Sequence, residues 1–170
     1  KKIISEINIR NKEKTTAISG KFTDVETLYA TKEFLESIGS KYYECRYDNV
    51  QFKNNNRESY LFNSSIQKID EADAILIVGS NPRWEASVLN TRIRKAYLHN
   101  DCKVGLIGES FDLTYKYSHL SECLSFLNEI IEGKSFFCEI LKKAKKPLII
   151  IGNSAINGED GEDVLDLCAQ

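Results

Sequence analysis

Short apolar runs alternate with amphipathic stretches along the whole of this chain of 170 residues. Continuous apolar runs of about five residues are typical of strands that helices cover on both faces of a sheet. Several of the runs end at a glycine, which favours a turn at that point. The strands that this pattern predicts cover residues 15–19, 41–45, 74–78, 103–107 and 147–151.

Helical spacing of apolar residues appears between these runs. Thr23 and Glu26 form a capping box at the start of the first helix, and Gly39 is the expected stop. Pro82 suits the first position of a second helix, with Asn81 as its N-cap. The predicted helices cover residues 24–38, 82–99, 120–131 and 136–144, and a last one follows the turn at residues 157–158.

Alternation of buried strands with helices predicts an α/β fold, which is a Rossmann-like, doubly wound, mainly parallel sheet with helices on both faces. We expect residues 1–170 to form a single domain and residues 15–19, 74–78, 103–107 and 147–151 to be adjacent parallel strands. The polar, asparagine-rich segment 48–65 has no clear periodicity and is interpreted as a long loop.

The composition of the chain argues against two classes of function, general nucleic-acid binding and membrane insertion. The net charge of −2 argues against a general nucleic-acid binder, which usually carries a basic excess. The chain contains no apolar run long enough to cross a membrane, so direct membrane insertion is not expected. It contains no methionine. We therefore expect it to be a piece of a longer protein.

The five cysteines are scattered and odd in number, which makes a disulfide framework a poor interpretation. No close-spaced set could hold an iron–sulfur cluster or a structural zinc ion. We expect small buried hydrophobic residues and no metal bound to this chain. The cysteines are Cys45, Cys102, Cys123, Cys138 and Cys168.

The turn after residues 74–78 carries the most specific local pattern. Gly79 ends the strand, and a helix begins two residues after Ser80. Backbone N–H groups at such a helix start suit an anion such as a phosphate. The structural alternative is that Asn81 only caps the helix and Gly79 only permits close packing. Patterns for classical dinucleotide, Walker-type and nucleophile-elbow sites are absent.

The string Gly-Ser-Asn-Pro-x-x-Glu at 79–85 resembles the segment that molybdopterin oxidoreductases place against the phosphates of their cofactor. A longer set of strings is similar to the large iron–sulfur subunit of respiratory complex I, the NADH–quinone oxidoreductase, and this likeness covers nearly the whole chain. These strings lie at residues 81–86, 89–95, 98–101, 103–108, 112–120, 141–147 and 152–155.

The resemblance implies a structural, molybdopterin-oxidoreductase-like α/β domain without a catalytic centre. It implies that the full subunit binds 4Fe-4S and 2Fe-2S clusters outside this chain and passes electrons from NADH toward quinone. The implied partners are the other peripheral-arm subunits of complex I and the N-terminal iron–sulfur part of the same subunit. The implied location is the cytoplasmic face of the bacterial inner membrane or the mitochondrial matrix side.

In cofactor-bearing relatives a cysteine after the second strand holds the metal, and Cys45 has that position here. The segment 48–56, polar and without glycine, replaces the glycine-rich stretch that packs against a pterin. We therefore expect no cofactor and treat the matching residues as vestigial. Two alternatives stay open: a molybdopterin-dependent oxidoreductase resembling formate dehydrogenase, and a free-standing nucleotide-binding module. The vestigial candidates are Cys45, Gly79, Ser80, Asn81 and Glu85.

Overall fold

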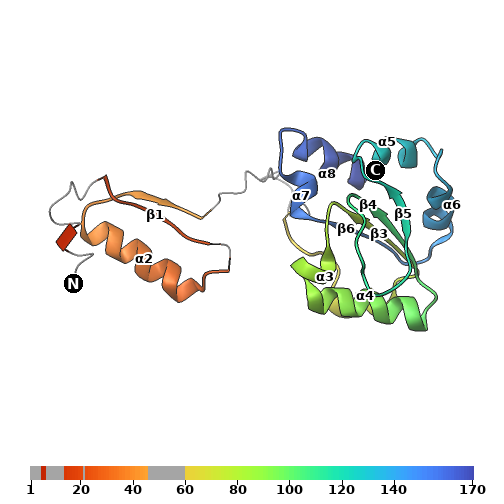
Figure 1. The fold of residues 1–170 in the computed structure, drawn as a ribbon, viewed down its shortest axis with the longest axis horizontal. Coiled ribbons are helices and arrows are strands. Elements are labelled where there is room, and N and C mark those ends of the chain that lie inside the picture. The colour runs from red at the N-terminus through yellow and green to blue at the C-terminus, as the bar shows by residue number, and fades with distance from the viewer. Residues whose placement is uncertain (1–4, 7–13, 21, 46–59) are drawn as a thin grey trace. The chain divides into compact units, whose positions relative to one another are not determined.

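The structure is a computed structural model that describes residues 5–6, 14–20, 22–45 and 60–170. Contacts within the chain divide it into two compact units, residues 1–49 and 50–170. Each is described by itself below, and Figure 1 shows the elements of both. The segment 48–56, which the sequence places opposite a cofactor, lies outside the described residues.

The first unit is a β-α-β arrangement. Strand β1 (Thr16–Ile18) pairs in parallel with β2 (Tyr42–Glu44), and helix α2 (Val25–Ser37) connects them. The helix start is one residue later than predicted, because Asp24 rather than Thr23 is the N-cap. Its carboxylate accepts the Thr27 backbone N–H at 2.7 Å.

Residues 15–19 were predicted to pair with the other three strands, and this prediction is wrong: they form no hydrogen-bonded pair with any of the three. Strand β1 belongs to a two-stranded sheet with β2 alone. A parallel pair needs a crossover between its strands, and α2 supplies one for β1 and β2. The stop at Gly39 is confirmed by its φ of +79°, a backbone conformation that glycine adopts without penalty.

The second unit is a four-stranded sheet in the order β5-β4-β3-β6. All three of its neighbouring pairs are parallel, so the prediction for residues 74–78, 103–107 and 147–151 is confirmed. The strands are β3 (Ala74–Val78), β4 (Lys103–Ile107), β5 (Ser118–Ser121) and β6 (Pro147–Ile151).

Helices of the second unit follow the prediction with several differences. Strand β5 occupies part of the segment predicted as loop and helix, and the helix after it is correspondingly short. Two elements were not predicted, the 3-10 helix η3 and the short helix α7. The bounds are η3 (Ile66–Glu71), α5 (Phe126–Ile131), α6 (Phe136–Lys143), α7 (Asn153–Ile156) and α8 (Gly161–Ala169).

The predicted helix 82–99 is two helices, α3 (Pro82–Glu85) and α4 (Ser87–His99). The break lies at Ala86, whose φ of −149° and ψ of 66° are not helical. A single continuous helix was therefore the wrong prediction. Ala86 ends the first helix and starts the second: its N–H bonds to the Pro82 carbonyl, and its own carbonyl accepts the Asn90 N–H.

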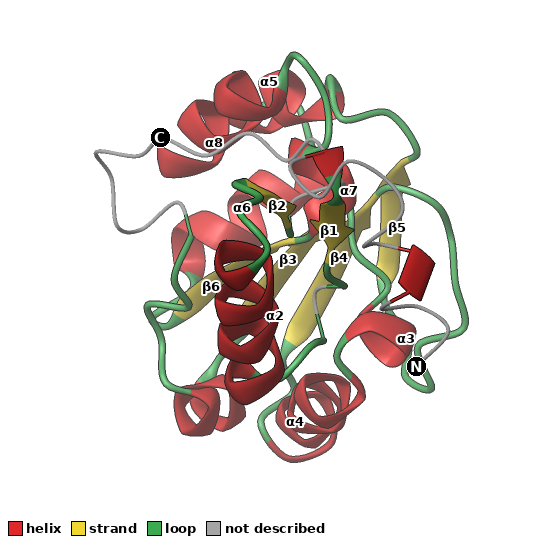
Figure 2. Ribbon diagram, turned by 90° about the vertical axis from the view of Figure 1, so that its left-hand side faces the viewer, coloured by secondary structure: helices red, strands yellow, loops and turns green. Residues whose placement is uncertain are grey.

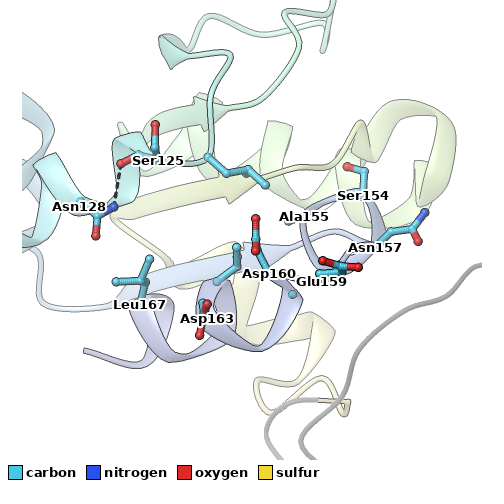
Figure 3. A pocket seen from close by; sticks show the side chains of 13 residues that line it. Ser125, Asn128, Ser154, Ala155, Asn157, Glu159, Asp160, Asp163 and Leu167 are labelled. Carbon is cyan, nitrogen blue, oxygen red and sulfur yellow. Dashed lines mark hydrogen bonds between the residues drawn. The ribbon is translucent and has the colours of Figure 1, made fainter.

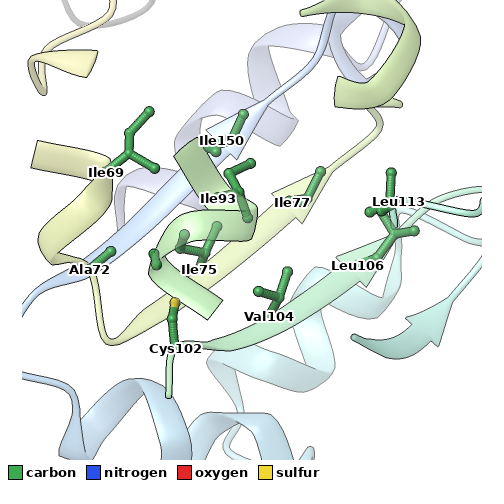
Figure 4. Close-up of a cluster of buried hydrophobic side chains, with 11 residues drawn as sticks. Ile69, Ala72, Ile75, Ile77, Ile93, Cys102, Val104, Leu106, Leu113 and Ile150 are labelled. Atoms are coloured by element: carbon green, nitrogen blue, oxygen red, sulfur yellow. The ribbon is translucent and has the colours of Figure 1, made fainter. Parts of the chain in front are cut away.

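The two faces of the sheet carry separate hydrophobic cores, as a doubly wound fold requires. Ile75 and Ile77 of β3 point to the face covered by η3 and α4, whereas Leu76 and Val78 point to the face covered by α5 to α8. Helices α4 and α5 lie on opposite sides of the strands in Figure 2. The first core is drawn in Figure 4, where Ile93 of α4 lies over the strands.

All five residues of β3 are buried, because the strand has neighbours on both sides and helices on both faces. Strand β6 has only one neighbour and is less deeply buried. The centre of the sheet, and with it the carboxyl end of β3, is therefore the most firmly held part of the second unit.

Candidate functional site

Strand order reverses between β3 and β6. The chain runs from β3 outward to β4 and β5, then returns to the other side of β3 as β6. In open α/β sheets, ligands bind in the crevice outside the carboxyl ends of the strands at such a switch point. Gly79 follows β3 and Gly152 follows β6, so these two glycines mark the position at which a ligand site would be expected.

At this position the ends of the two strands pack closely against each other. Gly79 has a φ of +57°, and a Cβ added to it would lie 2.6 Å from the Cβ of Ala155. A Cβ on Gly152 would lie 2.2 Å from the carbonyl oxygen of Gly79. The Ser154 hydroxyl donates to that same carbonyl oxygen. The strand ends and the start of α7 are thus in direct contact, and the glycines serve that packing.

The N–H groups of Gly79 and Asn81, in the turn that we expected to face a crevice, are bonded inside the chain. The Gly79 N–H donates to the Ile107 carbonyl at 2.8 Å. The Asn81 N–H donates to Glu85 Oε1 at 2.9 Å, and the Ser80 hydroxyl donates to Glu85 Oε2 at 3.1 Å. The carboxylate of Glu85 therefore takes the place that an external anion would need.

Asn81 is the N-cap of α3, as predicted, but its side chain makes no capping hydrogen bond. Its backbone carbonyl accepts the N–H groups of Trp84 and Glu85 instead. The side-chain oxygen Oδ1 is buried without a hydrogen-bond partner. Since this oxygen and the carboxylate of Glu85 are both acceptors, a phosphate placed on the turn would add acceptors where donors are needed.

A cavity of about 350 Å³ lies beside this region, between α5, α7 and α8. Figure 3 shows Asp160, Asp163 and Glu159 among its lining side chains, together with Ser154 and Asn157. None of the described residues that line it is a lysine or an arginine. The local potential is therefore unfavourable for a phosphate group.

The loop after β4 is bound to α3 and α4 by hydrogen bonds. The Arg83 guanidinium pairs with the Asp112 carboxylate at 2.6 Å and also donates to the Asp112 carbonyl at 2.9 Å. Together with the Thr114 N–H, this arginine lowers the pKa of Asp112. The Arg94 side chain donates to the Thr114 carbonyl at 3.0 Å. Thr114 has a φ of +71°, so these bonds hold a strained backbone in place.

Asn90 connects the same loop to the interior of α4. Its side-chain nitrogen donates to the Leu113 carbonyl at 3.2 Å, and its side-chain oxygen accepts the Tyr115 hydroxyl at 2.9 Å. Asn90 is 5% exposed, so both of its polar atoms depend on these partners. Burial raises the pKa of Tyr115, and the hydroxyl keeps its proton for this bond.

The basic residues of α4 have specific partners. Arg92 and Lys95 both pair with Asp70 Oδ2, at 2.8 and 2.7 Å. The hydrogen bond from Lys95 is the largest cause of the lowered pKa of Asp70. Cations near a helix end also offset the helix dipole, but these two attach α4 to η3 through a single carboxylate. Trp84, in contrast, is 82% exposed.

All five cysteines are free. Cys102 and Cys138 are buried, as expected, whereas Cys45 and Cys123 are exposed, so the expectation of buried hydrophobic residues is wrong for those two. Burial raises the pKa of Cys102 to about 12. Among the described residues, no group of three or more His, Cys, Asp or Glu side chains is placed to hold a metal ion.

Sequence reasoning singled out Gly79, Ser80, Asn81 and Glu85, and in the structure Ser80 and Asn81 bond to Glu85 in the turn after Gly79. It missed Ser154 and Ala155, which lie 75 residues away and contact the turn only through the pairing of β3 with β6. When two parallel strands pair, the residues that follow them lie close together. The position of the segment Gly152–Ala155 directly after the last strand could therefore have indicated that it contacts the turn after β3. Cys45 lies in the other unit, at the end of β2.

The sheet topology defines a class, which is a doubly wound α/β domain that has the switch-point geometry of cofactor-binding proteins. A family model for molybdopterin oxidoreductase matches residues 1–170. The chain therefore belongs to the molybdopterin oxidoreductase family.

Curated relatives resemble the chain over nearly its whole length. It is 37% identical over 172 residues to the NADH-ubiquinone oxidoreductase 75 kDa subunit of Reclinomonas americana, covering 94% of this chain and 25% of that protein. It is 38% identical over 170 residues to the mitochondrial 78 kDa subunit of Candida albicans, covering 98% and 23%. It is 36% identical over 167 residues to an NADH-quinone oxidoreductase subunit of Rickettsia bellii, covering 98% and 24%. The chain thus spans about a quarter of the length of these relatives.

Proposed function

We propose that this chain is a structural domain of the large iron–sulfur subunit of an NADH–quinone oxidoreductase, and that it carries no catalytic centre. One observation carries the proposal. Residues in the strings shared with that subunit, among them Arg83, Asn90, Asp112 and Tyr115, bond to one another. The polar groups of these residues bind the loop after β4 to α3 and α4, so the residues shared with that subunit stabilise the fold.

The same proposal holds that the turn at 79–85 binds no pterin dinucleotide. Three features support it: the Glu85 carboxylate on the Asn81 N–H, the contact of Gly79 with Ala155, and the acidic lining of the neighbouring cavity. A dinucleotide needs donors for its phosphates and an open crevice for its rings. Cys45 is accordingly assigned no metal.

The rest of the subunit supplies the electron-transfer chemistry in this proposal. A relative from Solanum tuberosum, 35% identical over 163 residues, is named an iron-sulfur protein of NADH dehydrogenase. We infer that 4Fe-4S and 2Fe-2S clusters lie outside this chain and pass electrons from NADH toward quinone. The partners are then that iron–sulfur part and other peripheral-arm subunits, on the cytoplasmic or matrix side of the membrane.

Two further inferences complete the proposal. Residues 1–170 act as one domain, which the match of a single family model to all of them supports. The chain does not cross a membrane. In its support, none of the helices within residues 5–6, 14–20, 22–45 and 60–170 is long and apolar enough to do so.

The test uses the full-length subunit expressed with its complex. Asn90→Ala removes both bonds to the loop after β4. We expect less assembled complex but an unchanged rate of NADH oxidation for each assembled complex, because the loss is structural. Glu122→Ala, at an exposed position, is the matched control. Normal assembly with a lost turnover rate would place the residue in the chemistry and contradict the proposal.

A second measurement separates this proposal from the molybdopterin-dependent alternative. We expect elemental analysis of the purified chain to find no stoichiometric molybdenum, tungsten, iron or zinc. Titration with a guanine nucleotide should give no saturable heat below millimolar ligand, which corresponds to less than about 4 kcal/mol of binding. Micromolar binding that disappears when Asn81 and Glu85 are replaced would favour an enzyme resembling formate dehydrogenase.

A further inference from the structure

We propose that Glu85 is a built-in anion that completes the turn after β3, and that its carboxylate, rather than a ligand, holds the start of α3 to that turn. The inference rests on the proposed function, because it names the group that occupies the place of the absent cofactor phosphate. It assigns to Glu85 a positioning role.

Both oxygens of the carboxylate are used. Oε1 accepts the Asn81 N–H at 2.9 Å, and Oε2 accepts the Ser80 hydroxyl at 3.1 Å. Asn81 and Ser80 are 8% and 9% exposed, whereas Glu85 is an exposed residue whose carboxylate covers them from the solvent side. Without the carboxylate, the Asn81 N–H would lose the partner seen here.

The arrangement replaces an ordinary helix cap. In a capping box, the N-cap side chain bonds to the helix while a glutamate at the third helical position bonds back to the N-cap N–H. Here the Asn81 side chain makes no such bond, and the glutamate is at the fourth position. Of the two hydrogen bonds of a capping box, only the one from the N-cap N–H to the glutamate is present, and Glu85 makes it.

Glu85 is the last residue of α3, and its side chain bonds back to the N-cap residue at the start of that helix. The next residue, Ala86, has a non-helical backbone, and α4 starts after it. Because Arg83 of the same short helix binds Asp112, α3 connects the end of β3 to the loop after β4. Glu85 fixes this connection at its sheet end.

The test compares Glu85→Ala, Glu85→Gln and the control Glu122→Ala by thermal unfolding of the full chain. Glu85→Ala should lower Tm by about 2–4 °C, since the Asn81 N–H and the Ser80 hydroxyl lose their partner. Glu85→Gln keeps an acceptor oxygen and should recover at least half of the loss. Formate or acetate, against chloride at equal ionic strength, should raise the Tm of Glu85→Ala alone, because a small carboxylate can enter the vacated place.

Two results would overturn the proposal: a Tm of Glu85→Ala equal to that of Glu122→Ala, or an equal effect of formate on every variant. If Glu85→Ala does not fold, hydrogen exchange of the Asn81 amide in Glu85→Gln decides. Slow exchange, as in the wild type, supports the role, and exchange at the rate of an open amide contradicts it. Micromolar binding of guanosine diphosphate to the wild-type chain would instead refute the proposed function, independently of these melts.

Discussion

The two units of this chain use the same kind of sequence signal with opposite results. Strand β3 is buried along its whole length, between two neighbouring strands and under helices on both faces. Strand β1 has one neighbour, and its Ile18 is 73% exposed. A short apolar run thus specifies a strand in both places, but the number of neighbours decides how much apolar surface it removes from water.

The difference bears on stability. Parallel strands are normally covered on both faces, and a two-stranded pair with one helix is marginal alone. The second unit has the separate cores expected of a self-sufficient domain. Most of the buried apolar residues of the described part lie in the second unit, so we expect most of the folding free energy to come from it.

The largest expected effect follows from separating the units. A chain of residues 60–170 should unfold cooperatively, because it holds both cores. A chain of residues 1–49 should be unfolded, because few of its described apolar residues are buried. Circular dichroism and thermal melts check both pieces. Cooperative unfolding of residues 1–49 alone would contradict the expectation that only the second unit folds by itself.

Core substitutions should differ strongly between the units. Ile77→Ala creates a cavity in the core under α4 and should cost about 3 kcal/mol of unfolding free energy. Ile18→Ala removes a mostly exposed side chain and should cost less than about 0.5 kcal/mol. Denaturant titrations of the full chain measure both. A cost above about 1.5 kcal/mol for Ile18→Ala would mean that this side chain is covered in solution.

Glycine substitutions sharpen the same comparison at smaller scale. A Cβ on Gly105 of β4 would lie 2.8 Å from the ring of Phe137, so Gly105→Ala should destabilise the chain by about 1–3 kcal/mol. Gly20→Ala, in the first unit, meets nothing closer than 3.9 Å and should change stability by less than about 0.5 kcal/mol. Equal melting temperatures of the two variants would show that the Phe137 ring can move away to make room for the added methyl group.

The smallest effect concerns pH. Hydrogen bonds from Lys95 and Arg92 lower the pKa of Asp70 in the folded state. The unfolded chain therefore binds this proton more readily, and the contribution of Asp70 is present above the unfolded pKa of about 3.9 and is lost as pH falls through the folded value. In Asp70→Asn, melts between pH 7 and pH 2 should show a smaller loss of stability with acid. An unchanged acid slope would mean that Asp70 is not paired in solution.

Helix starts and stops were largely predictable because they depend on neighbours in sequence. Gly39 and Pro82 have the roles that their own backbone chemistry favours. The break at Ala86 was not predictable in the same way. Ala86 is both the C-cap of α3 and the N-cap of α4, yet residues 83–90 contain no glycine or proline that would signal a break.

By itself the sequence determined the class of fold, three of the four strands of the larger sheet and the turn at which a ligand would be sought. Periodicity and turn residues are local, so they can be interpreted without knowing what packs against them. Only the tertiary structure decided whether that turn is open. Contacts from Ala155 and Ser154, and the bonds of Asn90 and Arg83 to the loop after β4, join residues 23 to 76 positions apart. Such contacts leave no periodic trace in a single sequence, because they arise when parallel strands align their carboxyl ends.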